Sequence, residues 1–296
     1  MKALTAYTSI YFVGAGGIGM SALVRYCLAK GFLVAGYDRT RTELTEALER
    51  EGARLFYDES AELIPVSFRN PETTLVVYTP AVPDTHEGLA YFRAHGFCVV
   101  KRAELLGLIT RESRGLCVAG THGKTTTSSM TAHILAQSAV GCSAFLGGIL
   151  KNYDSNLILS DRSDLVVIEA DEYDRSFHHL RPYMAVITAT DPDHLDIYGT
   201  REAYLESFRH FTSLIRPDGV LIMKKGLPLQ PELAPGVRLY TYSLDNGGDF
   251  YARNIRMGDG KILFDWVYPE GVVTDIDLGV PVRVNIENGV AAMALA

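Results

Sequence analysis

The chain has 296 residues, which predicts two domains at the usual size of about 150 residues each. Hydrophobic residues make up 47% and charged residues 21%, a globular composition that excludes a disordered, collagen-like or coiled-coil chain. Lys and Arg number 28 against 35 Asp and Glu, and the net charge of -7 disfavours broad binding to nucleic acid or to an anionic membrane. Binding of a phosphate ligand therefore requires a local site, since the overall charge does not attract it.

Apolar runs in the chain are short. Charged residues interrupt them well before the roughly 20 residues that a bilayer requires, and the first residues do not resemble a secretion signal. We therefore expect a cytoplasmic protein. The cysteines are far apart, without Cys-x-x-Cys or zinc-type spacing, and we interpret them as reduced core residues. They are Cys27, Cys98, Cys117 and Cys142.

Strands and helices alternate in the first part of the chain. Strands end at glycine or polar residues, and helices follow them. The pattern predicts strands at 9–13, 33–37, 75–78 and 98–100 and helices at 19–30 and 42–51. Such alternation is typical of a parallel sheet covered by helices on both faces. We expect an α/β fold with a Rossmann-like first domain over residues 1–107.

The second domain is predicted over residues 108–296, again with α/β alternation. Its expected strands are 116–119, 165–168, 184–187 and 219–223, and its first helix is 125–137. Residues 250–255 and 261–267 flank a Gly-rich turn, which predicts a small antiparallel appendage. The alternating Ile262, Phe264 and Trp266 fit a sheet core. An apolar helix from Asn288 runs to the last residue without a stop signal, so we expect the chain to be truncated.

Residues 14–19 match the pattern Gly-x-Gly-x-x-Gly, follow a predicted strand and open a helix. Glycines let the backbone approach a diphosphate, whose charge then meets the free amides of the helix N-terminus. Asp38 ends the next strand about 20 residues later, where a carboxylate accepts hydrogen bonds from ribose hydroxyls. The structural alternatives are a tight turn without a ligand and a turn or capping role for Asp38.

A second glycine loop, followed by a helix, lies after the strand 116–119. It reads Gly120-Thr121-His122-Gly123-Lys124-Thr125-Thr126, and it is two residues shorter than the usual phosphate loop. The loop amides can surround the β- and γ-phosphates of ATP, Lys124 supplies a positive charge, and the Thr125 hydroxyl is a ligand for Mg²⁺. The alternative is a chance Gly-Lys-Thr helix start.

Acidic residues follow two later strands. Glu169 is the first acid at the carboxyl end of the strand 165–168 and is a candidate metal ligand, whereas Glu172 and Asp174 fit a solvated acidic loop. His194 lies among three aspartates after the strand 184–187, which makes it a second candidate ligand. The pair His178-His179 lacks that setting, and we interpret it as structural.

Together these motifs resemble the Mur ligases of peptidoglycan synthesis. The resemblance rests on the two glycine loops, on Glu169-Ala170-Asp171-Glu172 and on Asp193-His194-Leu195-Asp196, and it covers essentially the whole chain. Within the family, the Gly-Gly-Ile-Gly-Met string and the Gly-Thr-His-Gly-Lys-Thr loop point to the alanine-adding member. The resemblance implies a UDP-sugar domain, a central ATPase domain, and a third domain that brings the amino acid and is missing here.

The resemblance also implies roles for particular residues. The UDP-sugar would contact Gly14, Gly16, Gly17, Ile18, Gly19, Asp38, Thr79, Pro80 and Ala81. The loop 120–126 would bind ATP, Thr125 and Glu169 one Mg²⁺, and His194 a second. Asn285 and Asn288 match the adenine-side motif, although Val284 replaces its usual histidine. Several relatives carry a carbamoylated lysine after the His-x-Asp motif, but this sequence has no lysine between Leu195 and Met223.

The implied reaction joins UDP-N-acetylmuramate to L-alanine and consumes ATP. The lactyl carboxylate attacks the γ-phosphate to form an acyl phosphate, and the alanine amine then displaces phosphate. Lys124, Glu169 and His194 would be the catalytic residues, and without the third domain we expect binding but very slow ligation. The alternatives are a nicotinamide-dependent dehydrogenase, a nucleotide switch without chemistry, and a related ligase that recycles peptides.

Overall fold

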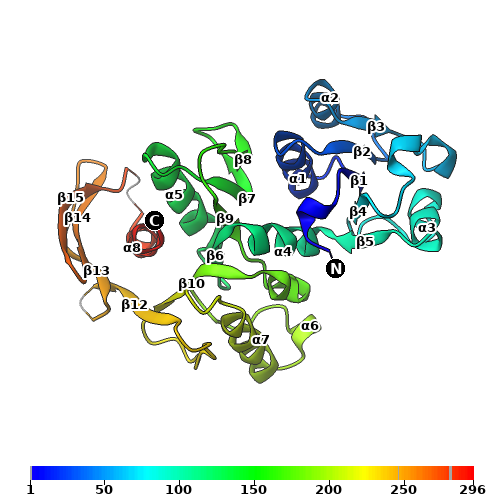
Figure 1. The fold of residues 1–296 in the computed structure, drawn as a ribbon. Coiled ribbons are helices and arrows are strands. Elements are labelled where there is room, and N and C mark those ends of the chain that lie inside the picture. The colour runs from blue at the N-terminus through cyan, green and yellow to red at the C-terminus, as the bar shows by residue number, and fades with distance from the viewer. Residues whose placement is uncertain (1, 246, 280–281) are drawn as a thin grey trace. The chain divides into compact units, whose positions relative to one another are not determined.

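The computed structural model describes residues 2–245, 247–279 and 282–296. The chain forms two compact units, of which the first ends at Glu112 and the second begins at Ser113 (Figure 1). The division therefore lies five residues beyond the expected boundary after residue 107. The reason is helix α4 (Arg102–Glu112), which continues without a break across that position.

The first unit is built on a five-stranded sheet in the order β3-β2-β1-β4-β5, with parallel neighbours. Its strands are β1 (Ser9–Val13), β2 (Leu33–Tyr37), β3 (Arg54–Phe56), β4 (Thr74–Tyr78) and β5 (Cys98–Lys101). Its helices are α1 (Ile18–Ala29), α2 (Glu43–Arg50), α3 (Glu87–Ala94) and α4, with short 3-10 turns η1 (Leu4–Ala6), η2 (Ala61–Leu63) and η3 (Val66–Phe68). The expected Rossmann-like parallel sheet is confirmed.

The site-forming end of this sheet follows from the strand order. All five residues of β1 are buried, and β1 pairs with β2 on one side and β4 on the other. The chain first adds strands on one side of β1 and later on the other, which opens a crevice at the carboxyl ends of β1 and β4. The glycine loop after β1 and the segment from Thr79 after β4 meet at this crevice.

The second unit contains a ten-stranded sheet in the order β15-β14-β13-β12-β11-β10-β6-β9-β7-β8. Its strands are β6 (Arg114–Ala119), β7 (Ser143–Leu150), β8 (Ser155–Ile158), β9 (Leu165–Glu169), β10 (Pro182–Ile187), β11 (Val220–Lys224), β12 (Arg238–Asp245), β13 (Phe250–Gly258), β14 (Lys261–Tyr268) and β15 (Gly271–Asp277). Its helical segments are α5 (Lys124–Gln137), η4 (Tyr173–His179), α6 (Leu195–Tyr198), α7 (Arg201–Ser213) and α8 (Val284–Leu295). The strands around β6 are parallel, so their carboxyl ends share one edge.

The antiparallel strands form part of the main sheet rather than a separate appendage. The pairing of β13 with β14 is antiparallel, as expected, but β13 also pairs with β12 in parallel and so continues the central sheet. Ile262 and Phe264 are fully buried and Trp266 packs against the same core, which confirms the expected alternation. The small appendage is corrected to a sheet extension.

Helix α8 begins at Val284, four residues before the predicted start at Asn288. It packs against α5 and against the strands β12 and β13 (Figure 1). Its buried residues Ile286, Val290 and Leu295 join the core of the second unit. Asn288 consequently lies within the helix rather than at its cap.

The cysteines are free, with three of them buried and Cys98 half-buried, which confirms their interpretation as reduced residues of the interior. None of the helices in the described parts of the chain is long and apolar enough to cross a membrane.

Candidate functional site

The loop 120–123 connects β6 to α5 at the carboxyl edge of the second sheet. Gly120 has a φ of +138° and Gly123 a φ of +81°, which favour glycine. A Cβ atom at Gly120 would lie 2.2 Å from Thr188 Oγ1, and one at Gly123 would lie 2.7 Å from Asn288 Oδ1. Both glycines are therefore required by backbone conformation and by the close approach of other side chains.

Hydrogen bonds from the segment after β10 hold this loop. Thr188 Oγ1 donates to the carbonyl of His122, and Thr121 N donates to the carbonyl of Ala189 at 3.1 Å. Thr121 Oγ1 donates to the carbonyl of Asp191 at 2.8 Å and lies 2.9 Å from the buried Tyr204 hydroxyl. The loop is thereby shaped before any nucleotide binds, which lowers the entropy cost of ordering it on binding.

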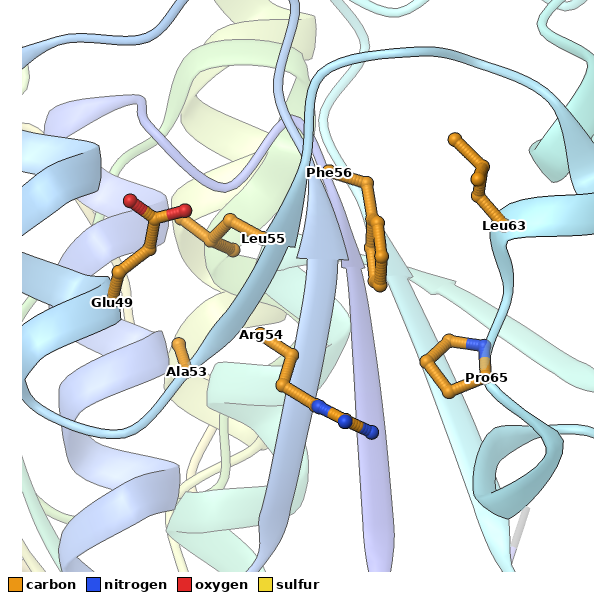
Figure 2. Close-up of a pocket in the computed structure, with 7 residues that line it drawn as sticks. All are labelled: Glu49, Ala53, Arg54, Leu55, Phe56, Leu63 and Pro65. Atoms are coloured by element: carbon orange, nitrogen blue, oxygen red, sulfur yellow. The ribbon is translucent and has the colours of Figure 1, made fainter.

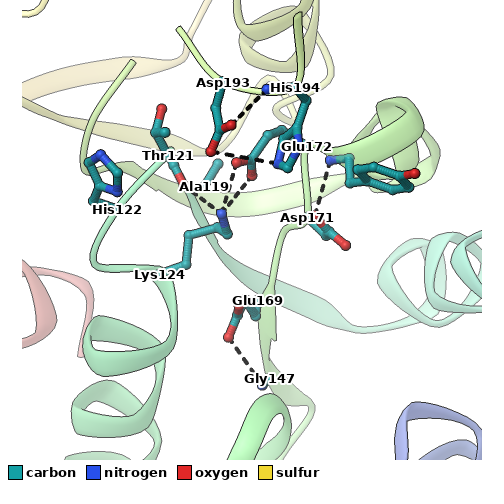
Figure 3. Close-up of polar contacts among 12 residues, drawn as sticks. Ala119, Thr121, His122, Lys124, Gly147, Glu169, Asp171, Glu172, Asp193 and His194 are labelled. Atoms are coloured by element: carbon teal, nitrogen blue, oxygen red, sulfur yellow. Dashed lines mark hydrogen bonds and ion pairs between the residues drawn. The ribbon is translucent and has the colours of Figure 1, made fainter. Parts of the chain in front are cut away.

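Lys124 is paired with a buried carboxylate. Its Nζ lies 2.8 Å from Glu172 Oε2 and donates to the Gly120 carbonyl at 2.8 Å (Figure 3). Only 1% of the Glu172 side chain is exposed, so its assignment to a solvated loop is wrong. The ammonium has three N–H groups, and two contacts orient it towards the loop. The sequence signal for Glu172 was its place in the acidic run after β9, but only packing shows its burial.

Glu169 and Thr125 face each other as expected for oxygen ligands of a metal. Thr125 Oγ1 donates to Glu169 Oε1 at 3.1 Å, and the Gly147 amide donates to Glu169 Oε2 at 3.1 Å. A Cβ atom at Gly147 would lie 2.4 Å from that carboxylate, so Gly147 is a site-forming residue that the sequence patterns did not indicate. Carboxylate and hydroxyl oxygens are ligands that suit Mg²⁺.

His194 lies apart from Glu169. Figure 3 shows His194 and Asp193 on one side of Lys124 and Glu169 on the other. The histidine has a φ of +52°, its side chain is 33% exposed, and its Nε2 lies 3.8 Å from Asp193 Oδ2. Within the described residues, no three side chains of His, Cys, Asp or Glu are grouped to hold a metal ion. A metal at either position must therefore take further ligands from substrate or water.

Asn285 and Asn288 lie one turn apart on α8, close to the loop. Asn288 Nδ2 donates to Asn285 Oδ1 at 3.2 Å, and Thr127 Oγ1 donates to Asn288 Oδ1 at 3.4 Å. Asn288 thus contacts both Gly123 and the second turn of α5. Two further residues of the predicted ATP site, His122 and Thr126, lie in the same segment, with His122 exposed.

In the first unit, the glycine loop borders a pocket of about 430 Å³. Gly14 has a φ of +89°, and a Cβ atom there would lie 2.4 Å from Thr79 Cγ2. A Cβ atom at Gly17 would meet nothing within 4 Å, so this side of the loop is open to a ligand. The pocket is lined by Gly14, Gly17, Met20, Tyr37, Asp38, Arg39, Thr40, Glu59, Thr79, Ala81, Val82, Pro83 and His86.

The carboxylate of Asp38 is used by the protein itself. Its Oδ2 accepts from the Gly16 amide at 2.6 Å, and its Oδ1 accepts from the Thr40 amide at 3.1 Å. This geometry matches the turn role that was the alternative to ribose binding. Pocket residues that the sequence patterns did not indicate include the buried His86, whose Nδ1 accepts from the Leu89 amide and caps α3.

A different hollow lies beside the edge strand β3 and has a volume of about 460 Å³. Figure 2 shows Phe56 facing Leu63 and Pro65, with the Arg54 side chain extending below Phe56 towards the side of Pro65. The lining is largely apolar, with Glu49 and Arg54 as its charged members, and it contains no glycine loop. The arrangement does not gather groups suited to phosphate or metal.

Comparison with known families shows to which family the chain belongs. Residues 9–114 match the model described as the Mur ligase family, catalytic domain, and residues 118–296 match the Mur ligase middle domain. The chain belongs to the Mur ligase family. The two matched ranges correspond closely to the two units of the fold.

Curated relatives of this Mur ligase chain are similar over almost all of it. Proteins named UDP-N-acetylmuramate--L-alanine ligase are 68% identical in Parabacteroides distasonis and 58% identical in Porphyromonas gingivalis, over 98% and 97% of this chain. The chain spans 63% of the length of both relatives.

Solved structures of the family share the fold. The UDP-N-acetylmuramate-alanine ligase of Thermotoga maritima is 27% identical with a TM-score of 0.76, over 97% of this chain and 64% of that one. A Neisseria UDP-N-acetylmuramate:L-alanyl-gamma-D-glutamyl-meso-diaminopimelate ligase gives a TM-score of 0.81 at 23% identity, over 98% of this chain and 93% of that one. The expected α/β Mur ligase fold is confirmed.

Proposed function

We propose that this chain is the UDP-sugar-binding and ATP-binding part of a ligase that joins UDP-N-acetylmuramate to L-alanine. The observation that carries the proposal is the loop at Lys124, with its counter-ion Glu172 and the adjacent Thr125–Glu169 pair. These groups match the needs of phosphoryl transfer, in which positioning and charge neutralisation supply most of the catalysis. The names of the relatives support the choice of sugar nucleotide and amino acid.

The reaction proceeds through two bond exchanges. A carboxylate oxygen of the lactyl group attacks the γ-phosphorus of ATP, the bond to ADP breaks, and an acyl phosphate forms. The alanine amine attacks the acyl carbon and phosphate leaves, so that an amide is made. Lys124 neutralises negative charge on the transferred phosphoryl group, and the loop amides donate hydrogen bonds to phosphate oxygens.

Mg²⁺ fits the residues present. The Thr125 hydroxyl and the Glu169 carboxylate already face each other at 3.1 Å, and both are hard oxygen donors. These two side chains would hold one ion, and we assign His194 to a second. When bound, the metal supplies positive charge that offsets the phosphates. The hydrogen bond from the Gly147 amide to Glu169 keeps the carboxylate directed towards Thr125 when no metal is bound.

The first unit supplies the acceptor site in this proposal. The pocket of about 430 Å³ beside the glycine loop has the size of a small-ligand site, and its open side at Gly17 leaves room for a diphosphate. Of the residues assigned to this ligand, Gly14, Gly17, Thr79 and Ala81 line the pocket. We assign Gly16, Ile18, Gly19 and Pro80 to the same site because they belong to the same two segments. The cytoplasmic location stays a prediction.

Ligand-dependent stabilisation tests the proposal on this chain. Thermal unfolding is followed with UDP-N-acetylmuramate, with a non-hydrolysable ATP analogue plus Mg²⁺, and with NAD. A ligand that binds the folded chain raises the unfolding temperature according to its concentration relative to the dissociation constant. We expect stabilisation by the first two ligands and none by NAD. K124M should lose only the ATP-analogue effect, and stabilisation by NAD alone would overturn the proposal.

A further inference from the structure

The turn after Glu172 has a strained backbone. Asp174 and Arg175 have φ values of +49° and +56°, so two successive residues other than glycine adopt the left-handed conformation. Such backbone persists only where the surrounding structure holds it in place, and it is frequent at functional sites. The Glu172 carboxylate lies at Lys124 in this arrangement, so its position depends on the contacts that hold the turn.

The turn is held at the backbone carbonyl of Glu172. This oxygen accepts one hydrogen bond from the Arg175 amide at 3.0 Å and another from the Tyr198 hydroxyl. The Arg175 guanidinium also lies over the Tyr198 ring, 4.8 Å from its centre. Tyr198 ends the short helix α6 and is buried, so water does not compete for its hydrogen bond. Tyr198 therefore ties α6 to the turn that carries Glu172.

Two residues from other segments hold the Tyr198 hydroxyl. The buried Ser207 on α7 donates from Oγ to this hydroxyl at 3.3 Å. His178 Nε2 in η4 lies 2.9 Å from Ser207 Oγ and 3.0 Å from the Ser207 carbonyl. A carbonyl oxygen only accepts, so Nε2 carries the proton and donates. The hydrogen bonds thus form a relay with one direction, from His178 through Ser207 and Tyr198 to the Glu172 carbonyl.

The far end of this relay places the ammonium of Lys124. Both carboxylate oxygens of Glu172 contact Lys124 Nζ, at 2.8 and 2.9 Å, and the Gly120 carbonyl accepts from it at 2.8 Å (Figure 3). A free lysine side chain loses rotamer entropy when a ligand orders it. An ammonium that is already held at the loop avoids this cost, so a phosphate binds there more tightly.

We propose that Tyr198, Ser207 and His178 are positioning residues for the binding of nucleotide phosphates. They fix the turn of Glu172, and Glu172 fixes the Lys124 ammonium at the loop 120–126. This inference rests on the proposed function, because it takes that loop as the nucleotide site. The three residues act through Glu172 and Lys124 and need no contact with phosphate themselves.

The first experiment compares Y198F with Y153F. Y198F removes the hydroxyl that donates to Glu172 and keeps the aromatic ring. Y153F is the matched control, because the Tyr153 hydroxyl also has hydrogen-bond partners in the second unit, His133 and Gln137 on α5. Binding of AMP, ADP and a non-hydrolysable ATP analogue is measured by calorimetry or ligand-observed NMR, with and without Mg²⁺.

We expect Y198F to bind ADP and the ATP analogue roughly three- to tenfold more weakly than Y153F does, the effect of one hydrogen bond. The loss should be the same with and without Mg²⁺. AMP affinity should differ less than twofold between the two variants, since the lysine of a phosphate loop reaches the β- and γ-phosphates.

Ser207 allows a test by conservative replacement. S207A removes the hydroxyl that joins His178 to Tyr198, whereas S207T keeps a hydroxyl at this position. We expect S207A and H178Q to weaken binding of the ATP analogue roughly three- to fivefold. S207T should bind the analogue as the unaltered chain does. Equal losses in S207A and S207T would show that packing rather than the relay matters, and would overturn the inference.

A double-mutant cycle tests whether the relay acts through Glu172. The effect of Y198F on binding of the ATP analogue is compared in the unaltered chain and in an E172Q background. We expect the loss to shrink to less than twofold with E172Q, because the carboxylate that Tyr198 positions is then absent. Urea denaturation verifies that each variant is folded under the conditions of the binding measurement.

The outcomes distinguish this inference from the proposed function. If the unaltered chain binds neither ADP nor the ATP analogue, the proposed function fails and the inference fails with it. If the unaltered chain binds them, and Y198F and Y153F bind them equally well, the relay does not position Lys124 and the proposed function stands. An equal loss for AMP, or an undiminished loss with E172Q, assigns Tyr198 a general packing role and overturns the inference. Since α6 directly follows His194, a loss seen only with Mg²⁺ would place the effect at His194 and overturn it as well.

Discussion

Both units begin with a strand, a glycine loop and a helix, yet the two loops use glycine for different purposes. In the second unit, Cβ atoms at Gly120 and Gly123 would collide with Thr188 and Asn288, so the space around the loop is filled by the protein. In the first unit, a Cβ atom at Gly14 would likewise collide with Thr79, but one at Gly17, at the start of the helix, would meet nothing within 4 Å, so the space there is left open. Glycine in the same motif position can therefore mean internal packing or room for a ligand.

The charged side chains beside the two glycine loops also differ. Lys124 already has Glu172 as its counter-ion, and Thr125 already donates to Glu169. Arg102, by contrast, has no partner of its own among the described residues. The charged side chains of the second loop thus form a neutralised network without any ligand. Four predictions test this contrast.

Breaking the ion pair of the second loop should have the largest effect. K124M leaves Glu172 as a buried carboxylate without a counter-ion, and we expect a loss of about 3 kcal/mol in the free energy of unfolding at pH 7. Urea denaturation measures the loss. The double variant K124M/E172Q is the control and should recover much of the stability, because no buried charge remains. Equal stability of K124M and the unaltered chain contradicts the neutralised network.

Alanine scanning of the two loops compares their packing directly. G120A must adopt a φ of +138° and collide with Thr188, and we expect a loss of about 2–3 kcal/mol in unfolding free energy. G17A has a φ of -68° and open space, so its unfolding free energy should change by less than about 0.5 kcal/mol. Thermal and urea unfolding of both variants provide the measurement. A larger loss for G17A than for G120A would reverse the contrast.

Acid should weaken the network behind the second loop. His178 Nε2 lies 2.9 Å from Ser207 Oγ, His210 lies beside its ring, and burial lowers the pKa of His178 to about 4. The unfolded chain, with a histidine pKa of about 6.5, binds the proton more readily, so stability falls as the pH drops from about 6.5 to about 4.

The expected loss over that pH window is about 2 kcal/mol, a partial value because the side chain is only half-buried. Urea denaturation at pH 7, 5.5 and 4.5 provides the measurement. H178Q cannot titrate and should show a correspondingly smaller pH dependence. An identical pH profile for H178Q and the unaltered chain would show that another group is responsible.

Removal of Asp38 should have the smallest effect. D38A loses two hydrogen bonds to amides of the glycine loop and its flank, and we expect a loss of about 1–2 kcal/mol in unfolding free energy without any ligand. D58A is a matched control, because Asp58 accepts from the exposed Ser60 amide outside the loop. If D38A matches D58A in stability but binds uridine more weakly, the ribose role is favoured over the turn role.

Much of the fold was predictable from local patterns. The bounds of β1 and β2 were predicted to the residue, because each is a continuous apolar run that ends where glycine or an acid follows. The three-residue β3 and helix α3 were not predicted, since the first is too short for a pattern and the second is capped by His86 rather than by a usual capping residue. The early start of α8 was missed because Arg283 and Val284 carry no capping signal.

The site was predictable to a lesser extent. Lys124, Thr125 and Glu169 were identified because motif spacing and strand ends bring them to one sheet edge, and the two side chains Thr125 and Glu169 do meet. Glu172 was assigned to solvent, since three residues of spacing from Glu169 do not reveal which way a loop turns. Its burial depends on the η4 segment and on Tyr198, whose hydroxyl donates to the Glu172 carbonyl.

Glycine loops, the positions of many strands and the residues placed at strand ends follow from the amino-acid pattern, because backbone conformation and hydrophobic burial act over a few neighbouring residues. The pairing of Lys124 with Glu172 and the approach of Arg102 to Gly19 span 48 and 83 positions. Such contacts form only after the sheets have assembled, because tertiary packing decides which side chains lie beside a charged group. No local sequence pattern contains this information.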